Sequence, residues 1–564
     1  MKKHSLIYFL APAIIAFAGC GDFLDTKIDT YTTPERVQTR YSTLWQFANA
    51  FYAPLQSGFD ILDGNLFAAA SDEAIQTSVE SDASFFNNGT INASVNPLEG
   101  LYTQYYEGIR AALFFLDYAK DGEHFLTLNR DTSAVTNMEN HISYEKQVRS
   151  LKWYRAEAHV AMAYYYSELI KMYGGVPIVK TLYENETNPG QLKRAEYDDV
   201  VDYIVELIDS QLDELQEDWA THPDNVASNA GRFDKAAALA IKARTLLYAA
   251  SPRNNPDGDR TKWVRAARAA ADLIAFKDYK MPRNRAYGTY FQGVNCINDK
   301  ETIFAIRKAA GNALEKANYP IATPGGHSGI TPTENLVADY ELIGLLDVVN
   351  PYNNRDPRLN ATVVVNGSRW NGRDIDQASR GSDDMNAKNS SRTGYYLKKF
   401  LTDNLNLQQG ATAQHVWVVY RYAEVLLNYA EAMNEAYGPD EAPAGFPMTA
   451  REALTEVRNS ASTMLPAVTV TSKADFRKAV KHERRIELAF EDHRYWDLLR
   501  WLDAEKELNK SIKGVKVTKT STGVFKYQTK TIATRVFNER NYYMPFPQAE
   551  VFNSKGALVQ NVGY

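Results

Sequence analysis

The sequence predicts a mainly α-helical fold: a tetratricopeptide-like helical-repeat scaffold with large irregular loops and a few short strands. Apolar residues recur at helical spacing through most of residues 35–280 and 415–510, and alanines gather where helices would cross closely. Between 281 and 414, Gly, Asn, Ser and Pro replace that periodicity. The composition, 45% hydrophobic and 23% charged, is typical of a globular protein. A net charge of −6 argues against nucleic acid as a partner.

The first 34 residues predict export and anchoring. Two lysines precede an apolar run over residues 6–18 that is too short to span a bilayer, which predicts a signal peptide over residues 1–19. The stretch Phe17-Ala18-Gly19-Cys20 resembles a lipobox, so we expect Cys20 to be lipidated; an ordinary signal peptide is the alternative. Residues 20–34 would then form a polar tether to the membrane.

Helical periodicity predicts the scaffold elements in order. Apolar stripes beginning at Trp45 and Leu101 indicate two helices, and a long third helix is expected over residues 141–172. Gly174-Gly175-Val176-Pro177 predicts its end. Further helices are expected over residues 197–216, 234–250, 262–276, 416–437, 450–460 and 473–508. Alanine at close crossings resembles tetratricopeptide pairs, although no clean repeat identity is found.

The remaining segments predict loops and short strands. The run Ala361-Thr362-Val363-Val364-Val365 indicates a strand inside the loop-rich insertion, residues 281–414. In the tail, residues 511–564, alternating apolar residues after Ile512 indicate a hairpin. Loops of this length in a compact protein are usually functional or are insertions between scaffold helices. We expect residues 35–564 to form one domain.

Several ordered motifs resemble the SusD/RagB family of surface lipoproteins. They are Cys20-Gly21-Asp22-Phe23-Leu24-Asp25, Met172-Tyr173-Gly174-Gly175-Val176-Pro177, Ala243-Arg244-Thr245-Leu246-Leu247-Tyr248-Ala249-Ala250-Ser251-Pro252, Arg355-Asp356-Pro357-Arg358-Leu359, the stretch from Glu483 to Leu498, and the ending from Tyr543 to Pro547 with Asn561-Val562-Gly563-Tyr564. The strongest is Glu483-Arg484-Arg485-Ile486-Glu487-Leu488-Ala489-Phe490-Glu491-Asp492-His493-Arg494-Tyr495-Trp496-Asp497-Leu498. On a helix, Asp497 lies three residues from both Arg494 and Arg500, a spacing that allows ion pairs. We interpret these motifs as scaffold with buried charges and expect function in the loops.

The resemblance implies a SusD-like domain, lipid-anchored at the cell surface on the outer membrane. It also implies a role without catalysis: capture of an oligosaccharide and its delivery to a partner TonB-dependent outer-membrane transporter of the SusC type. Three alternatives stay open. The same scaffold could carry peptides, the protein could be a surface glycoside hydrolase, or it could be a structural assembly lipoprotein with no small ligand.

Catalytic and metal-binding motifs are not found in the sequence. His482-Glu483 lacks the second histidine of a zinc protease, and Gly325-Gly326-His327-Ser328-Gly329 lacks the spacing of a nucleophile elbow. Asn255-Pro256-Asp257-Gly258-Asp259 favours a polar turn over a cation site. Cys296 favours a packed thiol. We therefore expect no catalytic residue, no metal and no cofactor.

Ligand-binding candidates come from loops that mix aromatic and polar side chains. A sugar offers apolar C–H faces and a rim of hydroxyls, so an exposed ring beside Asp, Asn or Arg suits it. The candidates are Asp72, Phe85, Asn87, Tyr287, Tyr290, Trp370 and Arg373. For each aromatic ring, packing inside a loop is the alternative. Trp370 is the preferred single candidate.

Overall fold

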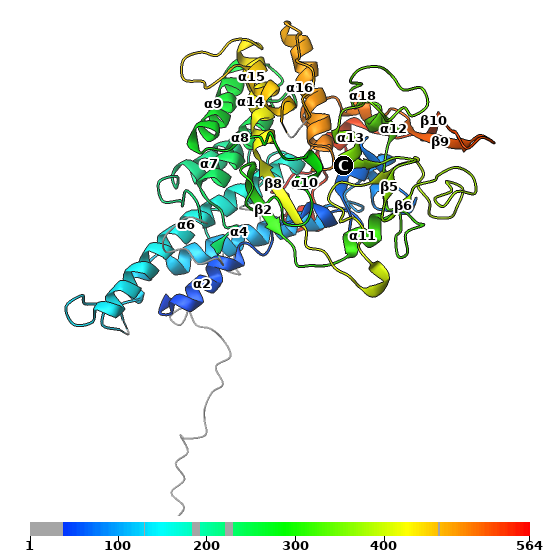
Figure 1. Ribbon diagram of the computed structural model, residues 1–564. Helices are drawn as coiled ribbons and strands as arrows, with labels where there is room; N and C mark the ends of the chain where they lie inside the picture. Colours follow the sequence, from blue (N-terminus) through cyan, green and yellow to red (C-terminus); the bar gives the residue numbers. More distant parts are fainter. Residues whose placement is uncertain (1–37, 129, 183–191, 220–228, 461–462) are drawn as a thin grey trace, which may run out of the picture.

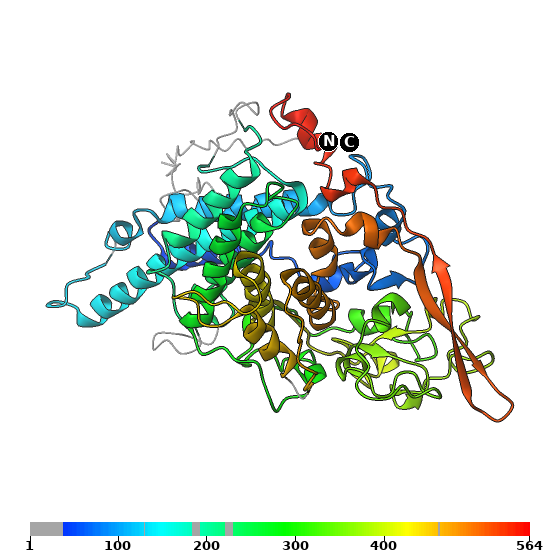
Figure 2. The ribbon, with the colours of Figure 1, turned by 90° about the horizontal axis from the view of Figure 1, so that it is seen from above.

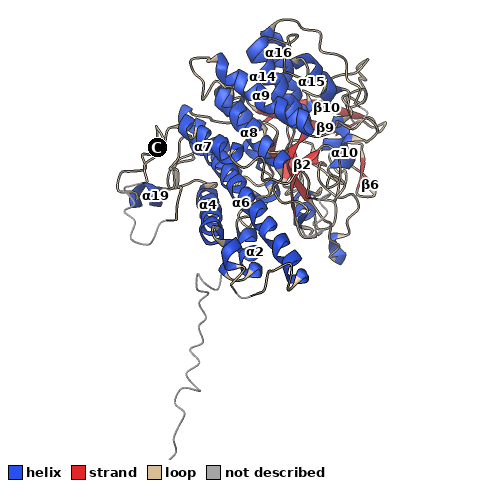
Figure 3. Ribbon diagram, turned by 90° about the vertical axis from the view of Figure 1, so that its left-hand side faces the viewer, coloured by secondary structure: helices blue, strands red, loops and turns tan. Residues whose placement is uncertain are grey.

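The computed structural model describes residues 38–128, 130–182, 192–219, 229–460 and 463–564 (Figure 1). The predicted signal peptide, Cys20 and the tether lie outside these residues. Helices gather on one side of the molecule, and loops with short strands lie on the other (Figure 3). The predicted mainly helical scaffold with large irregular loops is confirmed. Among the described helices, none has the length and apolar character that crossing a bilayer requires.

The scaffold is an array of helices in which each packs on the next. Its members are α2 (Tyr41–Ala50), α4 (Glu99–Ala119), α6 (Met138–Tyr173), α7 (Tyr197–Asp209), α8 (Lys235–Ala250), α9 (Arg260–Phe276), α14 (Tyr422–Tyr437), α15 (Ala450–Arg458) and α16 (Lys473–Glu487). Contacts run from α4 through α6, α7 and α8 to α9, and α14 then packs directly on α9 (Figure 1). The loop-rich residues between α9 and α14 are therefore an insertion into the array.

Helix α6 shows how the sequence sets this packing. The Asn137 side chain accepts a hydrogen bond from the backbone N–H of Asn140 at 3.0 Å, which caps the helix start. Ala156, together with other alanines along the helix, is fully buried and lets neighbouring helices approach closely. The helix ends at Gly174, whose φ of +76° favours glycine. The predicted long helix and its glycine stop are both confirmed.

The helix predicted over residues 416–437 is wrong in its first part. Residues Val416–Arg421 form strand β8, which pairs antiparallel with β2 (Thr302–Arg307), and the helix begins only at Tyr422. The strand reads Val-Trp-Val-Val-Tyr-Arg, and every residue in it is buried. Branched and aromatic side chains favour an extended backbone, and a continuous apolar run does not distinguish a buried strand from a buried helix.

The helix predicted over residues 473–508 is also wrong as one element. It is three helices: α16, α17 (Arg494–Arg500) and α18 (Ala504–Leu508). Phe490 and Asp492 have φ values of +66° and +62°, which turn the chain out of the right-handed helix. Two other predicted boundaries differ: α7 ends at Asp209, and only Val363–Val364 of the strand predicted over 361–365 is extended.

A buried arginine cluster links the helical side to the loop-rich side. We give this name to Arg358, Arg421, Arg458, Arg484 and Arg500 with their acidic partners Glu301, Asp356, Glu431, Glu483, Glu487, Glu491 and Asp497. The single guanidinium of Arg421 binds three carboxylates, with N–O distances of 2.6 to 2.7 Å. The prediction that the motif from Glu483 to Leu498 satisfies buried charges is confirmed.

Of the two ion pairs that the spacing in this motif allows for Asp497, one forms. Arg500 binds Asp497 at 2.8 Å, as the three-residue spacing allows. Arg494 instead binds Asp72, also at 2.8 Å, because α17 begins only at Arg494 and its side chain leaves the helix start toward the loop-rich side.

Short antiparallel pairs support the loop-rich side of the described chain. They are β1 (Ala74–Gln76) with β3 (Ile330–Pro332), β4 (Val363–Val364) with β7 (Tyr396–Leu397), and β5 (Arg369–Trp370) with β6 (Arg373–Asp374). Short helices also lie outside the array, and they are α3 (Ala83–Asn87), α5 (Gly122–Phe125), α10 (Tyr287–Tyr290), α11 (Ala313–Asn318), α12 (Glu334–Val337), α13 (Arg358–Thr362) and α19 (Gln548–Asn553). The predicted hairpin is confirmed: β9 (Ile512–Lys519) pairs with β10 (Phe525–Ala533) and projects from the body (Figure 2).

The last residues return to the helical side as a C-terminal strap, residues 543–564. The backbone N–H of Met544 donates to the carbonyl of Met172 at 2.8 Å. The Asn561 amide donates to the carbonyls of Tyr173 at 3.0 Å and Met544 at 2.7 Å. The strap therefore provides partners for carbonyl groups at the end of α6.

Candidate functional site

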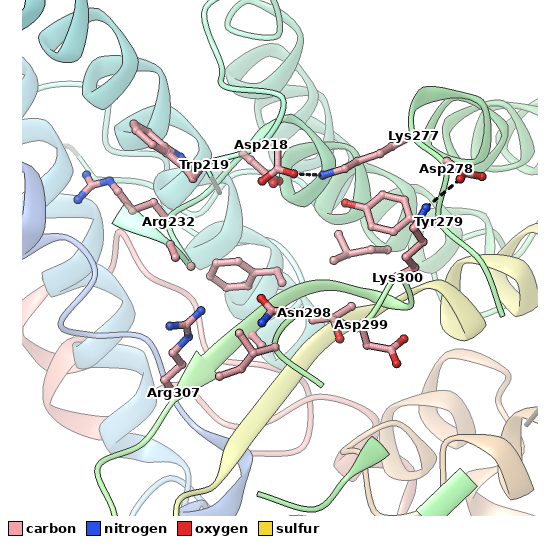
Figure 4. Close-up of a pocket in the computed structure, with 18 residues that line it drawn as sticks. Asp218, Trp219, Arg232, Lys277, Asp278, Tyr279, Asn298, Asp299, Lys300 and Arg307 are labelled. Carbon is pink, nitrogen blue, oxygen red and sulfur yellow. Dashed lines mark hydrogen bonds and ion pairs between the residues drawn. The ribbon is translucent and has the colours of Figure 1, made fainter. Parts of the chain in front are cut away.

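An open hollow beside strand β2 is the strongest candidate for a ligand site. We call it the β2 groove: the hollow of about 360 Å³ lined by segments around Asp218, Arg232, Tyr279 and Asn298 and by β2 (Figure 4). A second hollow of about 370 Å³ continues along the strand from Phe304 to Lys308. The two share lining residues, so together they form an elongated recess that suits a chain-like ligand.

Helix ends and a paired strand hold the lining in place. Asp234 caps α8, since its carboxylate accepts a hydrogen bond from the N–H of Ala237 at 2.8 Å. Helix α9 ends at Phe276, and the chain from Lys277 to Tyr279 then runs along the groove. Strand β2 is fixed by its pairing with β8. The groove is therefore built on regular elements although loops form its rim.

Charged side chains of both signs line the rim. The Lys277 ammonium binds the Asp218 carboxylate at 3.1 Å. Asp278 binds Lys280 at 2.9 Å and Lys300 at 3.0 Å, and all three side chains are more than 60% exposed. Hydrogen bonds from the two lysines lower the pKa of Asp278, which keeps this carboxyl group ionised. Exposed pairs of this kind contribute little stability and can exchange partners with a ligand.

Three polar groups in the groove are available to a ligand. The side chains of Arg307 and Asn298 are exposed, and no described residue forms a hydrogen bond or ion pair with either. Figure 4 places the Asn298 amide beside the Arg307 guanidinium, whereas the Tyr279 ring lies toward the other end with its hydroxyl directed to Asp218. Amide, guanidinium and phenol groups offer several donors and an acceptor over a short path, which suits hydroxyl-rich or acidic ligands.

The floor beneath these groups is aromatic and tightly packed. Phe304 stacks on Phe233 with ring centroids 4.6 Å apart. The Trp219 indole N–H donates to the carbonyl of Phe233 at 3.0 Å. Arg232 points away from the groove and binds the buried carboxylate of Glu157 at 2.7 Å (Figure 4). The floor is thus preorganised, so a ligand would meet fixed apolar edges below a polar rim.

The described acids of the groove are engaged in contacts within the protein. Burial raises the pKa of Asp234 to about 7, against the opposing hydrogen bond from Ala237. Burial, Asp234 and Asp218 also raise the pKa of Tyr279, so its hydroxyl stays a neutral donor. Asp218, Asp278 and Asp299 each bind a lysine or arginine. Among the described acids of the groove, Asp234 alone forms no ion pair.

Four residues predicted from the sequence as ligand contacts lie in the interior. The carboxylate of Asp72 binds Arg485 at 2.6 Å and Arg494 at 2.8 Å; burial opposes ionisation, but the two arginines hold the pKa of Asp72 well below its ordinary value. The Tyr287 hydroxyl donates to the carbonyl of Glu487 at 2.6 Å, and the Tyr290 hydroxyl lies 2.7 Å from that of Thr302. Trp370 is 3% exposed, and its ring packs edge-to-face on Tyr319.

The other three predicted contacts are partly exposed but separate. Phe85 and Asn87 belong to α3, where the Asn87 carbonyl accepts a hydrogen bond from the N–H of Val536 at 2.9 Å. Arg373, on β6, binds Asp383 with N–O distances of 2.5 and 2.6 Å. None of the predicted residues lines the β2 groove, although Tyr290 supports it from behind through Thr302. Their role in ligand binding stays a prediction.

Sequence reasoning did not identify the groove residues, because most of the rim lies in short polar connections and Arg307 lies at the end of a strand. Lys277-Asp278-Tyr279-Lys280 and Asn298-Asp299-Lys300 carry alternating charges next to an aromatic or amide side chain. This mixture of charged and aromatic or amide side chains after a predicted helix could have pointed to the groove, but the same mixture is common on protein surfaces. The described residues also contain no cluster of three or more histidine, cysteine or acidic side chains placed to hold a metal.

Comparisons with known proteins agree with this architecture. A SusD-like protein from Formosa agariphila is 23% identical over 396 residues, which cover 68% of this chain and 72% of that protein. A SusD-like carbohydrate binding protein from Bacteroides fragilis has the same fold, with a TM-score of 0.72 at 23% identity over 92% of this chain and 98% of that one. Surface glycan-binding protein A from Bacteroides thetaiotaomicron, solved with laminarihexaose, gives a TM-score of 0.62 at 17% identity over 92% and 99%.

Two family models match consecutive parts of the sequence. Residues 22–247 match a model described as starch-binding and associating with the outer membrane, and residues 290–564 match the SusD family model. The matches span both the helical array and the loop-rich side, in the same order as the relatives. The chain therefore belongs to the SusD family.

Proposed function

We propose that this protein is a non-catalytic lipoprotein of the outer-membrane surface that binds oligosaccharides in the β2 groove and delivers them to a TonB-dependent transporter. The observation that carries the proposal is the pair of exposed, unpartnered side chains, Arg307 and Asn298, above an aromatic floor within the described chain. The SusD-like carbohydrate binding protein of Bacteroides fragilis and the surface glycan-binding protein solved with laminarihexaose support the ligand class.

Calorimetric titration of the purified protein with neutral and acidic oligosaccharide panels tests the ligand class. We expect the variant Arg307→Ala/Asn298→Ala to lose about tenfold or more in affinity, since each side chain would supply a hydrogen bond worth roughly 1 kcal/mol. Arg265→Ala is the matched control, because Arg265 lies on α9 and pairs with Asp202 at 2.8 Å outside the groove. Binding of peptides with no response to any glycan would overturn the sugar assignment.

The absence of catalysis has its own test. Prolonged incubation with each ligand that binds should release no new reducing ends. Asp218, Asp278 and Asp299 of the groove are each held by a cation, and Asp234 caps α8, so these acids offer no free carboxyl pair to protonate a leaving group and activate water. Product formation that disappears in Asp218→Asn would identify a hydrolase instead.

An exposed apolar loop supports the partner assignment. Leu345 and Val348 are 86% and 87% exposed, and Leu342, Leu346 and Val349 of the same loop are also exposed. The loop is fixed at its base, where Leu342 pairs with Arg355 and Tyr352 packs edge-to-face on Tyr527. Such a patch on a rigid base is typical of a docking surface.

The docking proposal is tested by co-purification with a co-expressed TonB-dependent transporter of the SusC type. We expect Leu345→Ser/Val348→Ser to abolish co-purification while leaving ligand titration unchanged. The control Val79→Ser/Val135→Ser removes two valines elsewhere that are 67% and 94% exposed. If both double variants retain the transporter, this loop does not bind it.

A further inference from the structure

The β9–β10 hairpin and its flanks are strongly basic. Residues 508–538 contain Lys510, Lys513, Lys516, Lys519, Lys526, Lys530 and Arg535 but no aspartate or glutamate, although the whole chain has a net charge of −6. The hairpin projects from the body of the molecule (Figures 1 and 2). A projecting basic element on an acidic protein concentrates positive potential where anions can reach it.

Strand register gathers three of these lysines on one face, which we call the lysine face: Lys516, Lys526 and Lys530. Lys516 pairs with Gln528, and Lys526 and Lys530 lie two residues before and after Gln528 on the same strand. Directly paired residues share a face, and so do residues two apart along a strand. Both other lysines are therefore diagonal neighbours of Lys516, at about 7–8 Å, which is within reach of one anionic segment.

The lysine face is turned outward at Lys516 and Lys526, and at Gly514, opposite Lys530, it meets Thr393 of the body. The opposite face of the hairpin packs on the body. Val515 and Val517 are buried there. Tyr527 packs edge-to-face on Tyr352 at 5.3 Å, and its hydroxyl accepts a hydrogen bond from Asn366 at 3.2 Å. Lys516 and Lys526 are exposed, and Lys530 is half-buried.

The lysine face costs stability when it is empty. Like charges at neighbouring cross-strand positions repel one another. No described acid forms an ion pair with any of the three lysines. Partial burial and the charge of Lys516 lower the pKa of Lys530, which is the expected sign for an uncompensated cluster. A bound anion would remove this repulsion.

The side chains between the lysines indicate what kind of anion fits. They are Thr518 and Gln528, which are polar and exposed. The apolar side chain of Ile532 lies half-buried beside Gly514 at the base of the face, so the exposed part of the face is polar and does not suit a bilayer or a dry protein interface. We propose that the lysine face binds acidic polysaccharide through its sulfate or carboxylate groups, as a second surface separate from the β2 groove. Charge-assisted hydrogen bonds from lysine supply the contact, and repeating units along a polymer allow rebinding.

The experiment compares dextran sulfate, polygalacturonate and uncharged dextran on the full-length protein by biolayer interferometry at low and high salt. The test variant is Lys516→Gln/Lys526→Gln/Lys530→Gln. The matched control is Lys510→Gln/Lys513→Gln/Lys519→Gln, which removes the same charge from the same segment; Lys519 lies on the inner face and binds Asp376 at 2.9 Å. Thermal unfolding confirms that both variants are folded.

We expect both acidic polymers to bind the unmodified protein in a salt-sensitive manner and uncharged dextran not to bind through this face. The test variant should lose about tenfold or more in affinity, and the control about twofold or less. Response to one acidic polymer alone identifies whether sulfate or carboxylate is recognised. Equal losses in the two variants, unchanged binding in the test variant, or tighter binding to vesicles of anionic lipid than to either polymer would overturn the proposal.

The lysines could instead only guard the hairpin edge against pairing with another chain. In that case the test variant would self-associate in sedimentation while keeping its affinity for acidic polymers, which also overturns the proposal. A negative result for the lysine face can be distinguished from a negative result for the β2 groove. Neutral oligosaccharide titration reports on Arg307 and Asn298 and should not respond to the lysine variants.

Discussion

The buried arginine cluster and the β2 groove use the same charged side chains in opposite surroundings. In the cluster, Arg421 is 2% exposed, and its guanidinium donates to three carboxylates and to the carbonyl of Glu487. In the groove, Arg307 is exposed and has no partner among the described residues. Each arginine is the last residue of its strand: Arg421 ends β8 and Arg307 ends β2. The two strands pair with each other.

Burial and the number of partners, not residue type, therefore distinguish the structural Arg421 from Arg307, which is available to a ligand. A buried guanidinium that loses its carboxylates leaves charges in a medium that solvates them poorly. An exposed guanidinium stays hydrated whether or not a ligand is present. Substitutions in the cluster should therefore act on folding, and substitutions in the groove should act on binding.

The largest expected effect comes from breaking the cluster. Arg421→Met keeps much of the volume but leaves Glu301, Glu487 and Glu491 without their shared cation. We expect the free energy of unfolding to fall by about 3–5 kcal/mol, measured by urea denaturation. Arg451→Met is the control, since the Asp440 partner of Arg451 is 55% exposed. A loss below 1 kcal/mol in Arg421→Met would contradict the division between the two regions.

A second effect, dependent on pH, is expected at the edge of the cluster. Burial, reinforced by Asp72 and opposed by Arg485, raises the pKa of Glu73 to about 8 from an ordinary 4.5. The folded state then holds a proton that the unfolded state releases. This contribution to stability is fully present below pH 4.5 and is lost as pH rises toward 8, at no more than about 1.4 kcal/mol per pH unit.

The variant Glu73→Gln isolates this contribution. Its unfolding free energy relative to the unmodified protein should rise steadily between pH 5 and pH 8, because the amide cannot ionise. Chemical denaturation at several pH values measures the difference. A difference that does not vary with pH would mean that Glu73 is already ionised in the folded protein.

In the groove, removal of one hydroxyl should act on binding alone. Tyr279→Phe keeps the ring and deletes the donor that Figure 4 places toward Asp218. We expect ligand affinity to fall by a factor of about 3 to 10 and the unfolding midpoint to stay within error. Calorimetric titration and thermal unfolding of the same preparation check both parts. A large loss of stability with unchanged affinity would assign Tyr279 to the fold instead.

The smallest effect is expected for an exposed ion pair in the first part of α16 that belongs to neither region. Lys478 and Asp475 lie 2.8 Å apart on α16 with side chains 78% and 52% exposed. Lys478→Ala should change the free energy of unfolding by less than about 0.5 kcal/mol. Thermal unfolding at low and high salt measures it. A larger effect would show that exposure is a poor guide to the role of charge in this protein.

Much of the scaffold could be predicted from the sequence because its signals are local. The stop at Gly174, the caps and the alanine-rich faces each depend on neighbouring residues, and the predicted helices match at α6, α8, α9 and α15. The failures have a different cause. Strand β8 is defined by its pairing with β2, more than 100 residues away, and the turn at Phe490 and Asp492 is defined by tertiary contacts to Lys399 and Arg421.

The site was harder to predict for the same reason. Trp370 and Tyr287 have the composition of sugar-binding residues, yet tertiary packing encloses both rings. Arg307 looks like an ordinary strand end, and only the fold brings it beside Asn298 and below the rim from Lys277 to Tyr279. Which polar side chains can contact a ligand depends on their exposure after folding. That exposure is set by tertiary packing and not by neighbouring residues in the sequence.

The C-terminal strap has a consequence for the order of folding. The carbonyls at the end of α6 obtain their partners from Met544 and Asn561, near the other end of the chain. Those groups stay hydrated until two segments more than 370 residues apart in the sequence meet. Closing so long a loop is slow, so we expect this helix end to be among the last parts of the fold to form its native contacts.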